Sequence, residues 1–145
     1  MTPKRILVPL KGTARDEAVL SVVAPAAAAV GATLRLLHVA PVPRNLYSER
    51  GTVVMYSDQE MGRLEAQWGT YLTGVASTLH DVATEPIVRF GDPADEIVAE
   101  AEAWGAELIA MTRPRRSLLG WLRPGRLVEA VSRKVTIPVL GYQVR

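Results

Sequence analysis

Short apolar runs that alternate with helix-like segments constrain the fold of this chain most. The runs cover residues 4–10, 34–39, 108–111 and 137–142, and a shorter one covers residues 85–89. Strands this apolar cannot face water, and strands that alternate with helices form a parallel sheet covered on both faces. We therefore predict an α/β fold with a single doubly wound, Rossmann-like domain, in which about four helices flank a five-stranded parallel sheet.

Two prolines indicate which strands lie at the sheet edges. Pro86 and Pro138 fall within the runs at residues 85–89 and 137–142, and proline lacks the amide that a central strand needs. With 145 residues and 48% hydrophobic residues, the chain is long enough for one buried core. We expect residues 1–145 to form one domain.

The first helix is predicted from Thr13, a hydroxyl cap followed by acidic residues, to Gly31. Pro25 lies inside that helix and is expected to kink it. Its apolar positions at helical spacing are Ala18, Val19, Val22, Val23 and Ala26.

A long connection at residues 40–56 precedes a second helix. Loops of this length are usually mobile or functional. The helix that follows has its apolar positions three or four residues apart, which predicts one core-facing stripe. These positions are Met61, Leu64, Trp68, Leu72, Val75 and Leu79.

Two further helices complete the pattern. Asp92 and Pro93 predict the start of a helix that Gly105 ends. The last helix covers about residues 125–134.

A basic segment follows the fourth strand. Five arginines lie there without an intervening acidic residue: Arg113, Arg115, Arg116, Arg123 and Arg126. Ligands of doubly wound sheets bind beyond the strand carboxyl ends, where the winding reverses. We therefore expect an anion site between residues 11–13 and residues 111–116.

Composition excludes several classes of function. The formal charge is +2, so the five arginines account for the whole positive excess, which disfavours general nucleic-acid coating. Trp121 lies among these arginines, and aromatic side chains interleaved with arginine can stack on nucleic-acid bases, but a single loop tryptophan more often packs against a neighbour or a partner subunit. There is no cysteine and no apolar run of membrane-spanning length, so we expect a cytoplasmic protein that is not bound to membranes. We predict no metal site and no catalytic group, and expect structural roles for His38 and His80.

Four segments in this order resemble the universal stress protein family: VPLKGT, GATLRLLHVA, GDPADEIVAEAEAWGAELIAM and VTIPVLGYQVR. The resemblance covers essentially the whole chain. It implies a fold like that of the adenine nucleotide alpha hydrolases and a homodimer formed through the last strand. Many members bind ATP or another adenine nucleotide, and few are convincing enzymes.

The resemblance also implies candidate site residues. Pro9, Val39, Met111 and Leu127 match the apolar positions of an adenine pocket, and Lys11, Gly12 and Thr13 match the loop after strand one. The phosphate motif of the family, Gly-x2-Gly-x9-Gly-Ser/Thr, falls on Thr112, Arg115, Gly125 and Arg126. Only one glycine is kept, and an arginine replaces the hydroxyl residue. Glycines let backbone amides approach phosphate, so bulkier side chains there weaken ATP binding as the family does it.

Two functional hypotheses follow. The first is a non-catalytic, homodimeric stress-response module with a degenerate nucleotide site, which acts through ligand sensing or a protein partner. The second is an adenine nucleotide-binding or weakly hydrolysing protein, with ATP or AMP as a weakly held cofactor, in which Arg113, Arg115, Arg116 and Arg126 hold the phosphates. A different small anion is a further candidate ligand. The dimer would bury Val135, Ile137, Val139, Leu140 and Tyr142, which form an apolar edge strand.

Overall fold

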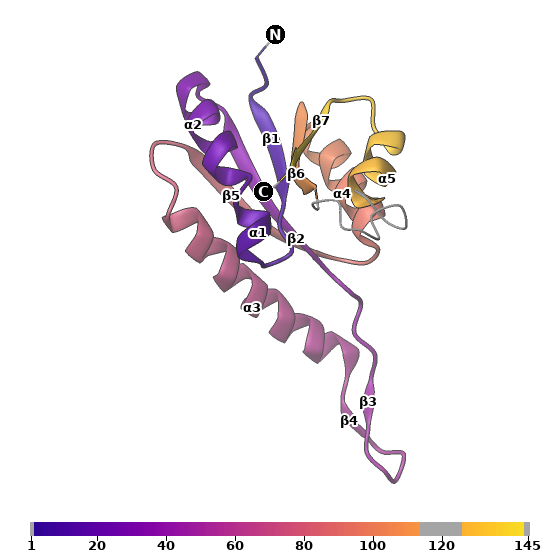
Figure 1. Ribbon diagram of the computed structural model, residues 1–145. Coiled ribbons are helices and arrows are strands. Elements are labelled where there is room, and N and C mark those ends of the chain that lie inside the picture. Colours follow the sequence, from indigo (N-terminus) through magenta and orange to yellow (C-terminus); the bar gives the residue numbers. More distant parts are fainter. Residues whose placement is uncertain (1, 114–125, 144–145) are drawn as a thin grey trace.

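The computed structural model describes residues 2–113 and 126–143. In this part of the chain, five parallel strands form one sheet in the order β5-β2-β1-β6-β7 (Figure 1). The strands are β1 (Arg5–Pro9), β2 (Thr33–Ala40), β5 (Ala83–Phe90), β6 (Leu108–Arg113) and β7 (Val139–Gln143). The predicted parallel, doubly wound sheet is confirmed.

The winding reverses between β1 and β6. The chain runs outward from β1 through β2 to β5, and then crosses back to place β6 on the other side of β1. Both predicted edges are confirmed, because β5 contains Pro86 and β7 starts directly after Pro138. The switch point therefore lies where the carboxyl ends of β1 and β6 separate.

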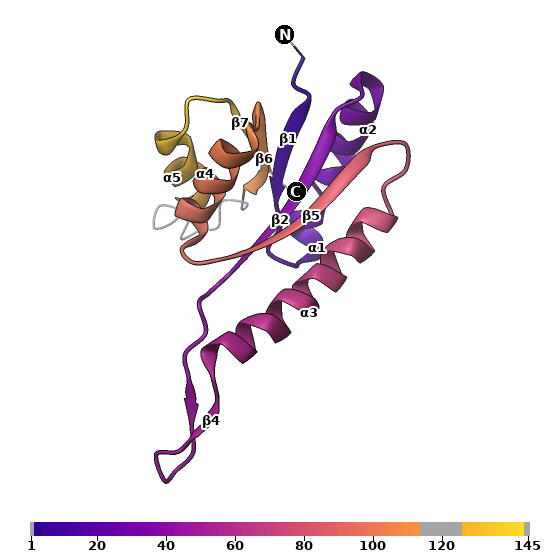
Figure 2. The same cartoon turned by 180° about the vertical axis from the view of Figure 1, so that it is seen from behind.

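Helices cover both faces of the sheet. The helices α1 (Ala14–Glu17), α2 (Leu20–Val30) and α3 (Ser57–Ser77) lie on one face, and α4 (Pro93–Trp104) and α5 (Arg126–Lys134) lie on the other (Figure 2). Successive residues of β1 alternate between two core clusters, with Ile6 and Val8 facing α2 and Leu7 facing α4. Strands apolar at every position are needed for this arrangement.

The predicted helix from Thr13 to Gly31 is interrupted. Its cap is confirmed, because the backbone N–H of Asp16 donates to Oγ1 of Thr13 (3.2 Å). The break falls at Ala18 and Val19, where the amides bond three residues back, whereas α2 continues through Pro25. The tighter turn rotates the core face, so Val22, expected to face the core, is 45% exposed. Ala26 is likewise exposed.

The connection at residues 41–56 contains a small hairpin that sequence patterning did not indicate. Strands β3 (Leu46–Tyr47) and β4 (Val53–Met55) pair antiparallel, and the hairpin extends away from the sheet together with the first turns of α3 (Figures 1 and 2). Only Leu72 and Val75 of α3 are buried. The expectation that Met61 faces the core is wrong, because this end of α3 lies beyond the sheet.

Candidate functional site

A cavity of about 320 Å³ lies at the switch point of the sheet. Its walls come from the ends of β1, β2 and β6, from α1, and from the first turns of α4 and α5. The lining residues are Pro9, Leu10, Lys11, Asp16, Leu37, Val39, Pro93, Ile97, Met111, Thr112 and Leu127. The cavity thus lies at the reversal point, where the site is expected, and the site itself stays a prediction.

The structure brings six predicted site residues together around this cavity: Pro9, Lys11, Val39, Met111, Thr112 and Leu127. Sequence reasoning missed the others. Leu10, Leu37 and Ile97 carry the apolar signal of any core residue, and Pro93 was explained by its place at the start of a helix. Asp16 was counted only among the acidic residues that follow the Thr13 cap, although it is only 8% exposed.

Gly12 and Thr13 belong to the loop between β1 and α1 but do not line the cavity. Gly12 has a φ of +98°, and a Cβ added to it would stand 2.7 Å from the ring of Trp68. Both its backbone conformation and its packing therefore require glycine. Thr13 caps α1, so these two residues determine the shape of the loop that carries Lys11.

Polar groups of the cavity wall are few, and most are already bonded. Oγ1 of Thr112 donates to the carbonyl oxygen of Asp16 (2.9 Å), which joins the end of β6 to α1. The backbone N–H of Lys11 donates to Oδ2 of Asp16 (2.6 Å), whereas the residue Lys11 is itself exposed. The hydroxyl of Thr112 therefore uses its proton to hold the loop, and it can meet a ligand only as an acceptor.

The structure describes two of the predicted basic residues away from the cavity wall. Nε of Arg113 lies 3.3 Å from the position that a Cβ on Gly141 would take, so this side chain lies against β7. Arg126 begins α5 and is exposed. The other predicted residues of this segment, Arg115, Arg116, Trp121, Arg123 and Gly125, lie outside the described residues, and the arginine cluster as a phosphate site stays a prediction.

An aromatic stack supports the end of β1 from the side opposite the cavity. Trp68 of α3 stacks on His38 of β2 with ring centroids 3.5 Å apart, and Nδ1 of His38 lies 2.7 Å from the carbonyl oxygen of Leu10. Burial lowers the pKa of His38, and this outweighs the Leu10 hydrogen bond and the nearby charge of Asp16, which raise it. His38 thus has a structural role: it bonds Leu10 at the end of β1 and stacks on Trp68.

A second contact joins α3 to α1. The hydroxyl of Tyr71 donates to Oε2 of Glu17 (2.8 Å). Burial raises the pKa of Tyr71, as do this hydrogen bond and the charges of Glu17 and Asp16. The helix α1 is therefore held by β6, by α3 and by its own cap, which makes the loop beside the cavity well fixed.

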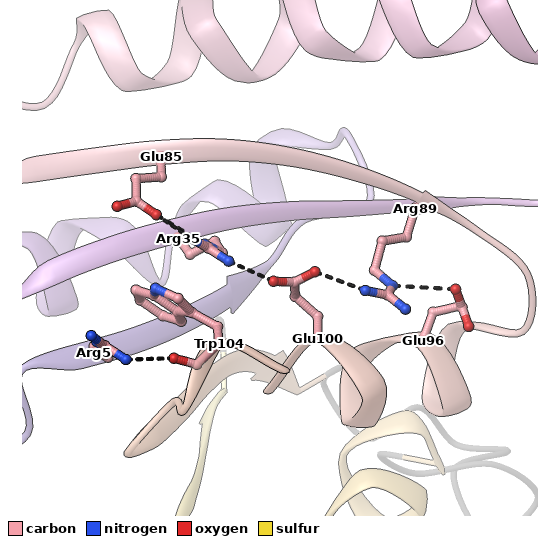
Figure 3. A network of polar contacts seen from close by, with 7 residues as sticks. All are labelled: Arg5, Arg35, Glu85, Arg89, Glu96, Glu100 and Trp104. Carbon is pink, nitrogen blue, oxygen red and sulfur yellow. Dashed lines mark hydrogen bonds and ion pairs between the residues drawn. The ribbon is translucent and has the colours of Figure 1, made fainter. Parts of the chain in front are cut away.

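A buried ionic network positions α4, whose first turns form another wall of the cavity. The carboxylate of Glu100 accepts from Arg35 of β2 (2.7 Å) and from Arg89 of β5 (2.9 Å), and only 7% of its side chain is exposed (Figure 3). Sequence reasoning missed this inward-facing glutamate. The sequence feature that could have indicated the buried Glu100 is an arginine on each of two neighbouring strands.

Further contacts complete the network in Figure 3. Nε of Arg35 donates to Glu85 (3.0 Å), and Nε of Arg89 donates to Glu96 (3.2 Å). The guanidinium of Arg35 also lies 4.4 Å above the ring of Trp104. Since each arginine keeps two acidic partners, α4 is held in one place along the sheet.

Two negative findings apply to the described residues. No group of three or more His, Asp or Glu side chains is arranged there to hold a metal ion. None of the helices in residues 2–113 and 126–143 combines the length and apolar character required to cross a membrane.

The fold and the cavity together define a doubly wound α/β domain with a cavity at its switch point. The Universal stress protein family model matches residues 2–142, and the chain belongs to that family. No curated protein matches the chain at a significant level.

Solved structures agree with the fold. The hypothetical protein MJ0577 is 23% identical, with a TM-score of 0.76 over 100% of this chain and 99% of its own. A universal stress protein in complex with cAMP is 16% identical, with a TM-score of 0.67 over 100% of both chains. A universal stress protein family protein from Arabidopsis thaliana with AMP bound is 13% identical, with a TM-score of 0.63 over 99% of this chain and 93% of its own.

Proposed function

We propose that this protein is a non-catalytic sensor whose cavity holds the base and sugar of an adenine nucleotide, with weakened contacts to the phosphates. One observation carries the proposal. Six residues that the sequence assigned to a nucleotide site surround a single cavity at the switch point, where doubly wound sheets bind ligands.

The size and character of the cavity support this class of ligand. Small-molecule sites are mostly apolar with a few polar groups, and they start at roughly 300 Å³. At about 320 Å³, this cavity suits a nucleoside better than a complete nucleoside triphosphate. Apolar side chains from three sides, among them Val39, Ile97 and Met111, provide surfaces for a flat base.

The relatives support an adenine base. Two proteins of the same fold were solved with cAMP and with AMP, which share that base and differ in the phosphate. Membership of the family makes the same base the first ligand to test here.

The phosphate end differs from what tight triphosphate binding requires. Thr112 stands where a glycine is expected, and its hydroxyl is engaged with Asp16. Close backbone approach to phosphate is therefore hindered, and the described cavity wall offers Lys11 as an exposed cation. We expect affinity to depend on the base and sugar more than on the number of phosphates.

Calorimetric titration with adenosine, AMP and ATP tests the proposal. We expect AMP and ATP to bind with affinities within about tenfold of each other, since each exposed charge contact contributes little. Val39→Trp would fill the cavity and abolish binding, whereas the same change at Val42, which is 59% exposed, would not. No heat with any of the three ligands, or undiminished binding by Val39→Trp, would contradict the proposal.

We also propose that the sensor is a homodimer formed through β7. This strand ends the sheet, so one row of its backbone groups pairs with no other strand of the described residues. Leu140 on it is 41% exposed, and Val139 and Tyr142 are partly exposed. An apolar edge strand favours pairing with a second copy.

A further inference from the structure

Asp16 is a buried acid in the wall of an apolar cavity. It is 8% exposed, and most of the other lining residues are aliphatic. A carboxylate is costly to place in such surroundings unless its oxygens have partners. The hydrogen bonds of Asp16 therefore show which of its oxygens could accept a hydrogen bond from a ligand.

Hydrogen bonds within the chain engage three of the four polar atoms of Asp16. Its backbone N–H donates to Thr13 (3.2 Å), its carbonyl oxygen accepts from Thr112 (2.9 Å), and Oδ2 accepts from the N–H of Lys11 (2.6 Å). Among the described residues, no donor reaches Oδ1 and no cation forms an ion pair with Asp16.

The remaining oxygen belongs to a residue of the cavity wall, and it has no partner among the described residues. The space that Asp16 borders is the cavity itself. We propose that Oδ1 of Asp16 accepts a hydrogen bond from the bound ligand, and so selects a ligand that presents a neutral N–H or O–H donor.

This inference rests on the proposed function and adds to it the orientation of the ligand. A carboxylate repels phosphate, so the phosphate should avoid the carboxylate of Asp16 and lie nearer the ammonium group of Lys11, the cation of the described cavity wall. The donor that meets Oδ1 is then on the base or the sugar. An adenine nucleotide offers both kinds, the exocyclic amine and the ribose hydroxyls, and both present the same chemistry to the acid.

Four ligands distinguish these sources in a calorimetric titration: AMP, purine riboside 5′-monophosphate, 2′-deoxy-AMP and 3′-deoxy-AMP. Each of the last three lacks one donor of AMP. In the unmodified protein we expect one of them to bind about tenfold or more weakly than AMP, because a hydrogen bond to a charged group is lost. The analogue that is weakened identifies the group that faces Asp16.

Asp16→Asn makes the test specific to the acid. The amide oxygen of asparagine can still accept from the N–H of Lys11, while its NH₂ group replaces Oδ1 and turns an acceptor into a donor. AMP should bind the variant more weakly, and the penalty for the missing donor should shrink to about twofold or less. Asp58→Asn, on the exposed first turn of α3, is the matched control and should leave the ligand series unchanged.

Each outcome has one meaning. Equal binding of all four ligands by the unmodified protein would overturn the role of Asp16, whatever the variant does, while leaving nucleotide binding in place. A penalty that persists at full size in Asp16→Asn would also overturn it. Failure of AMP itself to bind would instead overturn the proposed function, and this inference with it.

Discussion

Trp68 of α3 stacks on His38 of β2 with an interplanar angle of 18°, and the same indole lies against Gly12 in the loop beside the cavity. The imidazole in turn bonds the carbonyl oxygen of Leu10. A single aromatic side chain from the helix that extends beyond the sheet therefore supports the end of β1 at two points. The following predictions begin with this contact.

Protonation of His38 should destabilise the fold. Because burial lowers its pKa in the folded protein, the unfolded chain binds this proton more readily. The contribution of neutral His38 to the free energy of unfolding is complete above its unfolded pKa of about 6.5. It is lost as the pH falls from there through the lower pKa of the folded protein. The groups that face the ring are the Leu10 carbonyl, Asp16 and Trp68.

Urea unfolding between about pH 7.5 and pH 5.5 measures this effect. His38→Gln should reduce the loss of unfolding free energy over that range, while His80→Gln, at an exposed position, should leave it unchanged. The assignment to His38 fails if the two variants show the same pH dependence as the unmodified protein.

Gly12→Ala should cost about 1–3 kcal/mol of unfolding free energy, because its positive φ is strained for alanine and the new methyl group meets Trp68. Gly62→Ala is the control, since nothing lies within 4 Å of its Cβ position in α3. Helix propensity predicts that this second change stabilises the protein by about 0.5–1 kcal/mol. Thermal unfolding of both variants gives the signs, and a neutral Gly12→Ala would show that the loop is not held as described.

Glu100→Gln should destabilise the protein by about 2–4 kcal/mol, because it leaves two guanidinium groups with one acidic partner each at a buried position. Glu102→Gln, on the exposed side of the same helix, should change stability by less than about 0.5 kcal/mol. Denaturant unfolding measures both. Equal effects would mean that the network in Figure 3 does not position α4.

Leu140→Glu should turn the proposed dimer into a monomer, because it places a charge on the exposed edge strand β7. Sedimentation velocity at micromolar concentration measures the oligomeric state. Val22→Glu, at a similarly exposed position on α2, is the control and should remain dimeric. An unmodified protein that sediments as a monomer would contradict the dimer directly.

The sheet was predictable because each of its strands carries a local signal. Buried parallel strands are apolar at every position, and Pro86 and Pro138 marked the two edges correctly. The cap at Thr13 and the helix end at Gly31 were predictable for the same reason, since one residue type satisfies each terminus.

Features that depend on contacts between distant residues were not predictable. The break at Ala18 lacks a proline or glycine, so the periodicity suggested a continuous helix with Pro25 as its weak point. Asp16 and Glu100 seemed to be ordinary helix-surface acids, and only their partners, such as Lys11 and Arg89, show that they are buried and bonded. Only part of the cavity wall was predicted, because a family motif marks aligned positions and not the neighbouring residues that complete the wall.

A crystal structure of the protein soaked with AMP would show where the nucleotide binds. We predict the adenine and ribose inside the cavity between Val39 and Met111, a ligand donor within hydrogen-bond distance of Oδ1 of Asp16, and the phosphate near the ammonium group of Lys11. A nucleotide bound anywhere else on the protein, with this cavity left empty, would contradict this prediction.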